Sequence, residues 1–281
     1  MIVEPARRDD VLALMQETYG SAMSPAEFDW WFDRNPAGPR IVTEARDDDG
    51  TALGVLAMSC ARMSQGLAAF AVHAVTSPAA RGRGVFSTLE LHNEQQAAAA
   101  GATWALGFTN PMAGPILVGR LGWEDLASLR IWVRPKRLRR RGEGHLRLAA
   151  GVPPFERSRP LRAHHIVRDP EYLNWRYADS PRLYVCIEDV VVTHAIWHGF
   201  SSAVVCEGGD TRSLRRAVAA VAADVAVAMV NPGEERTYLA AGFVPSPRTI
   251  RFIGKRLTED APALPRERRA WQLSLGDLDF F

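Results

Sequence analysis

The sequence predicts a protein of the α/β class, in which helices pack on a mixed sheet (an α+β arrangement). It also predicts that the chain consists of two related halves. Three observations point to this fold class. Strand-like and helix-like segments alternate over the first 135 residues in the order βααβββαβαβ, which favours a sheet with helices on both faces. An almost unbroken apolar strand runs directly into a glycine-containing loop and a helix. Several landmarks of the first half also recur in the second.

Local start and stop signals place the elements of the first half. Val11, Leu12 and Met15 recur at helical spacing and predict the first helix. Ser24, followed by a proline, is typical of a helix start, and Gly101 is typical of a helix end. In order, we expect strand 2–4, helices 9–19 and 25–34, strands 40–45, 52–59 and 67–76, helix 85–100, strand 103–108, helix 111–121 and strand 129–133.

Two aromatic segments, one in each half, resemble each other. The stretch EFDWWFDRNPAGPRIV around Trp31 is similar to EYLNWRYADSPRLY around Trp175. Further along, the Leu-Gly-Trp run at Gly122 has a counterpart, Ala-Gly-Phe, at Gly242. The first pair of landmarks is 91 residues apart and the second pair 67, so the second half reads as a repeat that is 24 residues shorter. A chance similarity between two aromatic helices is the alternative.

A basic, proline-containing stretch separates the halves. Residues 134–147 hold seven Lys or Arg, which is typical of a solvated connection, and a patch for an anionic partner is the alternative. We expect a first domain at 1–135, a linker at 136–155 and a degenerate second domain at 156–281. The elements expected in the second domain are strands 183–187, 190–197 and 203–206, helix 213–223, strand 225–230, helix 234–241 and strands near 250 and 272.

Composition narrows the class of function. The apolar fraction of 47% and charged fraction of 23% are those of a soluble globular protein, and a net charge of +2 gives no electrostatic case for nucleic acid. Cys60, Cys186 and Cys206 lack metal-ligand spacing, so we expect no metal and a reducing, cytoplasmic compartment. The first ten residues carry five charges, and the longest near-apolar run has fourteen residues. We therefore expect neither a signal peptide nor a membrane span.

The most informative segment is the loop between the strand ending near Thr76 and the helix beginning near Val85. The first turn of a helix has unpaired N–H groups and a positive dipole end, and glycines let a ligand approach the backbone closely. Arg81 and Arg83 add positive charge. The pattern predicts an anion site, although it lacks both the lysine-bearing nucleotide loop and the three-glycine dinucleotide fingerprint. A solvent-facing arginine turn is the alternative.

This segment resembles the acetyl-CoA pyrophosphate loop of the GCN5-related N-acetyltransferases, whose pattern is [QR]-x-x-G-x-[GA]. Arg81 matches the first position and Gly84 the first glycine, whereas Phe86 replaces the final Gly or Ala. Downstream, F-T-N-P…G-R-L-G-W, which contains Asn110, is similar to the family's N-x…L-G-F run. The resemblance covers residues 1–135. It implies a tandem acyl-CoA N-acyltransferase fold with a complete N-terminal copy and a degenerate C-terminal copy.

The same resemblance implies acetyl-CoA, or another acyl-CoA, as co-substrate. The end of the fourth strand would offer backbone groups to the pantetheine arm and the thioester carbonyl. The loop would hold the pyrophosphate, and an asparagine after the next strand would contact the pantetheine. The implied CoA-binding residues are Ala74, Val75, Thr76, Arg81, Gly82, Arg83, Gly84, Val85, Phe86 and Asn110.

The catalytic groups are marked less clearly. Attack of a neutral amine on a thioester requires a base and a prepositioned donor for the oxyanion. His73 is a candidate base because histidine titrates near neutral pH, and a structural histidine is the alternative. The tyrosine that many family members place before Leu-Gly-Phe is Val118 here, while the corresponding residue of the second half is Tyr238. Aromatic side chains of the first two helices belong to the core or line the acceptor cleft: Tyr19, Phe28, Trp30 and Trp31.

Together these expectations describe an acyl-CoA-dependent N-acyltransferase acting on a primary amine of a small molecule, amino sugar or natural product. A tandem aminoacyl-tRNA-dependent transferase and a non-catalytic CoA-binding protein are the alternatives. The loop E-G-G-D-T-R before Ser213 carries two acids and no arginine–glycine pair, so the second copy is expected not to bind CoA. The expected partner is a small-molecule amine, with neither membrane nor nucleic acid. A homodimer is left open.

Overall fold

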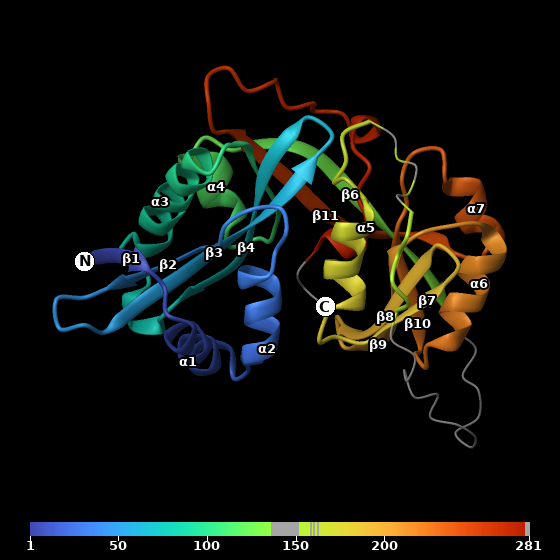
Figure 1. The fold of residues 1–281 in the computed structure, drawn as a ribbon, viewed down its shortest axis with the longest axis horizontal. Helices are drawn as coiled ribbons and strands as arrows, with labels where there is room; N and C mark the ends of the chain where they lie inside the picture. Colours follow the sequence, from blue (N-terminus) through green and yellow to red (C-terminus); the bar gives the residue numbers. More distant parts are fainter. Residues whose placement is uncertain (136–151, 158, 160, 162, 279–281) are drawn as a thin grey trace. The chain divides into compact units, whose positions relative to one another are not determined.

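The chain forms two compact units in the computed structural model (Figure 1). The first unit comprises residues 1–126 and 252–266, and the second comprises residues 127–251 and 267–281. The expected mixed α/β fold is confirmed, because each unit combines helices with a sheet of parallel and antiparallel strands. The structure describes residues 1–135, 152–157, 159, 161 and 163–278.

The sheet of the first unit brings the carboxyl ends of two parallel strands to one edge. Strands β1 to β4 pair in antiparallel fashion, and β4 and β5 are parallel. The carboxyl ends of two adjacent parallel strands lie side by side, and ligands of α/β sheets commonly bind at this end. In spatial order the strands are β1 (Ile2–Pro5), β2 (Ile41–Arg46), β3 (Ala52–Met63), β4 (Gly66–Thr76), β5 (Ala102–Thr109) and the end of β11 (Val244–Arg256).

Helices cover both faces of this sheet (Figure 1). On one face, α3 (Val85–Ala99) packs its buried side chains into a core with β2, β3 and β5. On the other face, α1 (Arg8–Tyr19) packs against β3 and β4. The remaining helices are α2 (Pro25–Phe28), which continues into a π-helical turn (Asp29–Asp33), and α4 (Gly114–Arg120).

The start of α2 shows why the local sequence signal was reliable. The Ser24 hydroxyl accepts a hydrogen bond from the Glu27 N–H at 3.2 Å, and the Glu27 carboxylate accepts one from the Ser24 N–H at 2.8 Å. This reciprocal capping box, with proline at the first helical position, fixes the helix start.

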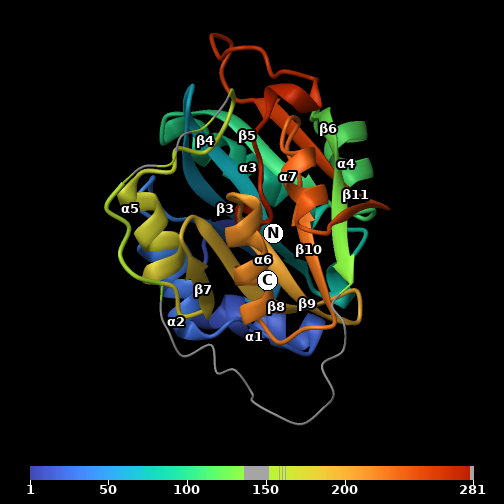
Figure 2. The ribbon, with the colours of Figure 1, turned by 90° about the vertical axis from the view of Figure 1, so that its right-hand side faces the viewer.

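The second unit repeats the arrangement on a smaller scale. β7, β8 and β9 are antiparallel, and β9 and β10 are parallel. Helices α6 and α7 pack together on a core that includes Leu214, Tyr238 and Phe243 (Figure 2). The elements are β6 (Glu124–Pro135), α5 (Pro170–Leu173) with a π-helical turn (Asn174–Ala178), β7 (Tyr184–Ile187), β8 (Val190–Trp197), β9 (Phe200–Glu207), α6 (Thr211–Ala220), β10 (Val225–Met229) and α7 (Glu235–Ala240).

The last strand of each sequence half contributes to the unit of the other half. Residues 131–135 of β6 pair with β10 in the second unit. The end of β11 belongs to the first unit, where the Phe252 ring lies 5.2 Å from Phe108 and the Leu257 N–H donates to the Thr103 carbonyl at 2.8 Å. The strand expected at 129–133 is present as part of β6, and its residues belong to the second unit. The units also differ in extent from the expected domains 1–135 and 156–281.

The end of the chain departs from the strand expected near residue 272. Trp271 forms an isolated β-bridge with His164 in place of a strand, and a short 3-10 turn (Leu275–Asp277) follows. Buried arginines hold this segment. Arg168 bonds Ser274 at 3.2 Å and also Asp277, and Arg176 donates to the carbonyls of Gly276 and Leu278 at 3.0 and 3.2 Å. Most of the expected linker 136–155 lies outside the described residues, apart from 152–155.

The two π-helical turns support the internal repeat but shift its register. Counting from Pro25 and Pro170, the first residues of α2 and α5, Trp175 corresponds to Trp30 and not to Trp31. The Gly122–Gly242 pairing agrees with the structure. Each glycine lies two residues beyond a short helix, with φ of 76° and 92°, and precedes a long strand.

Candidate functional site

The candidate site begins where β4 separates from β5. The two strands pair only as far as Ala71 and Gly107, yet β4 continues to Thr76. In the described part of the chain, residues 72–76 therefore present their backbone along an open edge. Such an edge can accept an extended ligand by main-chain hydrogen bonds.

A β-bulge lies at the point of separation. Leu56 of β3 pairs with Ala74, but Met58 pairs with Ala71, so Val72 and His73 together oppose a single residue. A bulge bends its strand and redirects backbone and side-chain groups, and bulges occur often beside active sites. This bulge places His73 at the start of the open edge.

The loop after β4 combines two left-handed glycines with a helix start. Gly82 and Gly84 have φ of 78° and 79°, and a Cβ added to either would meet nothing within 4 Å. Gly84 is the residue directly before α3. The first-turn N–H groups of α3 have no intrahelical acceptor, so this loop offers an open, positively polarised cradle to an anion.

The two loop arginines are not equivalent. Arg83 is about half exposed and pairs with Asp47 at 3.1 Å, whereas no ion pair is recorded for Arg81 among the described residues. Hydrogen bonds from the Asp48 N–H and from Arg83 lower the pKa of Asp47. Phe86, at the expected Gly or Ala position, packs partly buried against the core. Its ring is thus accommodated on the inner side of the helix, and Arg81 carries the uncommitted charge of the loop.

Tyr19 contacts the open edge of β4 from the end of α1. Its hydroxyl donates to the Ala74 carbonyl oxygen at 2.8 Å, and its side chain is exposed. Burial raises the pKa of the Tyr19 phenol, opposed by the charge of Arg81. The His73 ring lies edge-on to Phe32, with centroids 6.1 Å apart. Tyr19 and His73 therefore both belong to the edge that the sequence marked for the thioester. Phe28, Trp30 and Trp31 are buried.

Asn110 follows β5 at the same end of the sheet. Its Oδ1 accepts from the N–H groups of Met112 and Ala113, both at 2.9 Å, and so shapes the turn into α4. The Nδ2 group is the part of this side chain available to a ligand. Val118 on α4 packs against the core, so that helix provides no hydroxyl at this position. The corresponding Tyr238 is 3% exposed in the second unit, where burial raises the pKa of its phenol.

The second unit has the same opening but a different loop. β9 and β10 pair only as far as Val204 and Val227, and Gly208 and Gly209 follow β9. The Asp210 carboxylate accepts from the N–H groups of Arg212 at 2.6 Å and Ser213 at 3.1 Å. Asp210 is the N-cap of α6, and its carboxylate takes the first-turn N–H groups that a bound anion would use. The start of α6 is therefore closed to a phosphate.

The structure brings most of the predicted CoA-binding residues to one edge of the first unit: 74–76 on the open strand, 81–86 in the loop and Asn110 after the neighbouring strand. The sequence did not indicate the Tyr19–Ala74 contact, because a side chain at a helix end gives no sign of which strand it reaches. Within the described residues, no group of three or more potential metal ligands gathers. None of the described helices has the length and apolar character needed to cross a membrane.

Comparison with known proteins identifies the fold. No family model and no curated protein matches the sequence. Among solved structures, the chain is similar to a GCN5-related N-acetyltransferase from Kribbella flavida, with a TM-score of 0.57 and 14% identity over 91% of this chain and 72% of that one. A GCN5-related N-acetyltransferase from Anabaena variabilis matches with a TM-score of 0.56 and 10% identity over 92% and 73%.

Eis1 from Mycobacterium abscessus matches with a TM-score of 0.53 and 13% identity, over 92% of this chain and 74% of that one. These matches extend over nearly the whole chain and so include both units. They confirm the resemblance found in the loop sequence at the level of the fold. The chain therefore has the fold of the GCN5-related N-acetyltransferase superfamily.

Proposed function

We propose that the chain is an acyl-CoA-dependent N-acyltransferase, which moves an acetyl or other short acyl group from CoA to a primary amine of a small molecule, amino sugar or natural product. One observation carries the proposal. β4 leaves β5 at the Val72–His73 bulge, and its open edge leads into a two-glycine loop at the start of α3. The arrangement suits a ligand with an extended, amide-bearing arm and a doubly charged anionic group.

The loop fits the pyrophosphate of an acyl-CoA. The open space beside Gly82 and Gly84 leaves room for phosphate oxygens, and the first-turn N–H groups of α3 supply donors. Arg81 adds a cation without a competing ion pair in the described structure. Bulky side chains at either glycine would fill the cradle, which explains the use of glycine there.

The open edge fits the pantetheine arm. The backbone of Ala74, Val75 and Thr76 is unpaired toward β5, so it can exchange hydrogen bonds with the two amides of the arm. Asn110 would add its Nδ2 donor from the other side of the opening. In the structure the Tyr19 hydroxyl donates a hydrogen bond to the Ala74 carbonyl oxygen. This bond must break before the pantetheine arm can bond the same oxygen.

The bound acyl-CoA supplies the acyl group as an activated thioester. We assign the backbone N–H groups at the bulge the role of donors to the oxyanion. We assign His73 the role of base toward the attacking amine, directly or through water. Val118 on α4 has no ionisable proton. The phenol of Tyr19, at the end of α1, is therefore the candidate proton donor to the departing thiolate.

Two alternatives remain distinguishable. An aminoacyl-tRNA-dependent transferase would rely on the basic stretch 134–147, most of which lies outside the described residues. The pyrophosphate-type loop favours CoA over tRNA. A non-catalytic CoA-binding protein is the second alternative, and it draws its support from Val118.

Thiol release separates these readings. Purified protein is incubated with acetyl-CoA and a panel of amines that includes amino sugars, polyamines and amino acid esters, and free CoA is measured with a thiol reagent. Amine-dependent release that disappears in Gly84→Val supports the proposal. Acetyl-CoA binding with no release for any amine favours the non-catalytic reading. Binding of tRNA in place of acetyl-CoA would overturn the proposal.

A further inference from the structure

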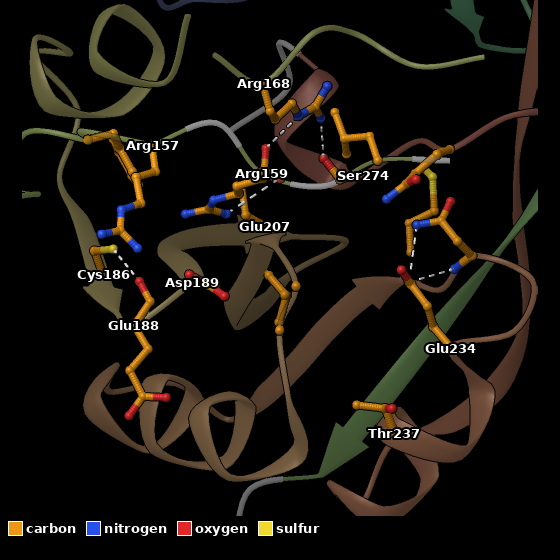
Figure 3. Close-up of a pocket in the computed structure, with 18 of the residues that line it drawn as sticks. Arg157, Arg159, Arg168, Cys186, Glu188, Asp189, Glu207, Glu234, Thr237 and Ser274 are labelled. Carbon is orange, nitrogen blue, oxygen red and sulfur yellow. Dashed lines mark hydrogen bonds and ion pairs between the residues drawn. The ribbon is translucent and has the colours of Figure 1, made fainter. Parts of the chain in front are cut away.

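The second unit contains a pocket of about 690 Å³ that the proposed acyltransferase activity does not use (Figure 3). It lies where β9 and β10 stop pairing, beside Gly208 and Gly209, and Tyr238 also lines it. The carboxyl ends of adjacent parallel strands are the usual ligand position in α/β sheets. A pocket of this size is within the range that holds small organic molecules.

One guanidinium in this pocket lacks a hydrogen-bond acceptor. Both terminal nitrogens of Arg159 are buried without a hydrogen-bond partner in the described structure, and the side chain is only 12% exposed. The group stacks over the Phe155 ring at 5.1 Å. It forms an ion pair with Glu207, but the 3.7 Å separation of the two groups is beyond hydrogen-bond distance.

Glu207 is also committed elsewhere. It accepts from Arg168 at 3.2 Å and from the Tyr177 hydroxyl at 2.7 Å. Arg168 in turn bonds Asp277 and Ser274. Buried polar groups in folded proteins almost always have partners, so the unsatisfied donors of Arg159 indicate an acceptor that the described residues do not supply.

Two other acids of the pocket have partners of their own. Glu188 bonds Ser213 and pairs with Arg216 at 3.0 Å, and Glu234 caps Asn231. Arg157 and Arg159 extend toward the same region of the pocket (Figure 3), which Glu156 and Asp189 also line.

Apolar side chains form much of the remaining wall: Phe155, Leu161, Val205, Met229 and Leu273. We propose that this pocket binds a small organic anion, with its carboxylate or phosphate group on Arg159 and its apolar body against this wall. The anion does not bind at the start of α6, because Asp210 caps that helix. The proposal is independent of the CoA loop of the first unit.

The test uses the full-length protein and four probes that differ in charge and apolar body: benzoate, phenyl phosphate, inorganic phosphate and benzylamine. Ligand-observed NMR and calorimetry measure binding to the wild type, Arg159→Met, Arg159→Lys and Arg81→Ala. We expect saturable binding of benzoate or phenyl phosphate, weakened about tenfold or more in Arg159→Met and less in Arg159→Lys. Inorganic phosphate should bind more weakly than phenyl phosphate, and Arg81→Ala should leave the binding unchanged.

Several results would overturn the proposal. Equal binding of benzylamine and benzoate would remove the anion preference even if the Arg159 variants did not fold. Undiminished benzoate and phenyl phosphate binding in a folded Arg159→Met would assign these ligands to another site. The absence of saturation for both aromatic anions would show that the pocket holds no such anion. Displacement of phenyl phosphate by acetyl-CoA, with loss in Arg81→Ala, would place the anion in the first unit.

Discussion

The Tyr19 hydroxyl donates a 2.8 Å hydrogen bond to the carbonyl oxygen of Ala74, on the part of β4 that has no neighbour on the β5 side. This contact blocks a backbone acceptor that an extended ligand would use. A net hydrogen bond contributes about 0.5–1.5 kcal/mol. Tyr19→Phe should therefore tighten acetyl-CoA binding by roughly 2- to 10-fold in calorimetry.

The same variant also tests the proposed proton donor. If the phenol protonates the thiolate, kcat should fall in Tyr19→Phe while the dissociation constant for acetyl-CoA falls as well. Weaker binding in this variant would mean that the hydroxyl contacts the ligand directly. An unchanged kcat would leave Tyr19 with a positional role only.

The Arg83–Asp47 ion pair predicts unequal effects for the two loop arginines. The Arg83 guanidinium forms an ion pair with the Asp47 carboxylate at 3.1 Å, and Arg81 has no such partner in the described structure. Arg81→Ala should weaken acetyl-CoA binding by about 10- to 100-fold, as expected for a charge-assisted hydrogen bond. Arg83→Ala should have a smaller effect. Asp47→Asn should strengthen binding by releasing Arg83, and equal effects of both alanine variants would contradict this assignment.

Gly84 and Gly101 form a matched pair of left-handed glycines at opposite ends of α3. Their φ angles are 79° and 89°, and a Cβ at either would meet nothing within 4 Å. Valine at each position should cost a similar backbone strain, on the order of 1–3 kcal/mol. Gly84→Val should also abolish acetyl-CoA binding, while Gly101→Val should retain it. Calorimetry measures acetyl-CoA binding of the two variants at equal folded fraction. Equal loss of binding in both would mean that Gly84 is an ordinary turn residue.

Local signals predicted the elements around the site well. Ser24, Gly101 and the loop from Arg81 to Gly84 each act within a few residues, so the sequence alone indicates them. The exchange of β6 and β11 between units was not predictable in this way. An apolar strand can pair with many other strands, and its own sequence does not determine which one becomes its neighbour in the sheet.

The one-residue error in the repeat has a specific cause. Aligning identical residues pairs Trp31 with Trp175, but two tryptophans adjoin in the first half, and the helix starts show that Trp30 is the structural equivalent. The pocket around Arg159 was missed for another reason. Its lining residues come from segments between Pro153 and Ser274, which no motif connects.

Glu90 predicts an unusual dependence of stability on pH. Its side chain is 1% exposed, and burial, reinforced by Glu94 and opposed by Lys255, raises its pKa to about 8. The folded protein keeps this proton between roughly pH 4.3 and 8, where the unfolded chain releases it. Its contribution to the free energy of unfolding is therefore fully present below this window and is lost as pH rises through it, by about 1.4 kcal/mol per pKa unit.

Glu90→Gln should remove this loss. Denaturant unfolding should show the variant gaining stability over the wild type between about pH 5 and pH 9, with Glu17→Gln at an exposed position of α1 as the control. A parallel pH dependence of wild type and Glu90→Gln would show that Glu90 is ionised in the folded protein.

The difference between the two helix starts predicts how many acyl-CoA molecules bind. At α3 the N-terminal N–H groups are open beside Gly84, and at α6 the Asp210 carboxylate occupies the N–H groups of Arg212 and Ser213. A pyrophosphate at α6 would have to displace this cap against its charge. Calorimetry should therefore give one acetyl-CoA per chain.

The variants assign that single site. Gly84→Val should reduce the stoichiometry from one to zero, because it acts on the first unit alone. Asp210→Ala should leave the value at one and lower the free energy of unfolding by about 0.5–2 kcal/mol through loss of the cap. A stoichiometry near two in the wild type, or one site persisting in Gly84→Val, would mean that the second unit binds CoA. In that case the Arg159 pocket would be the first place to look for it, since it opens at the same carboxyl ends of parallel strands.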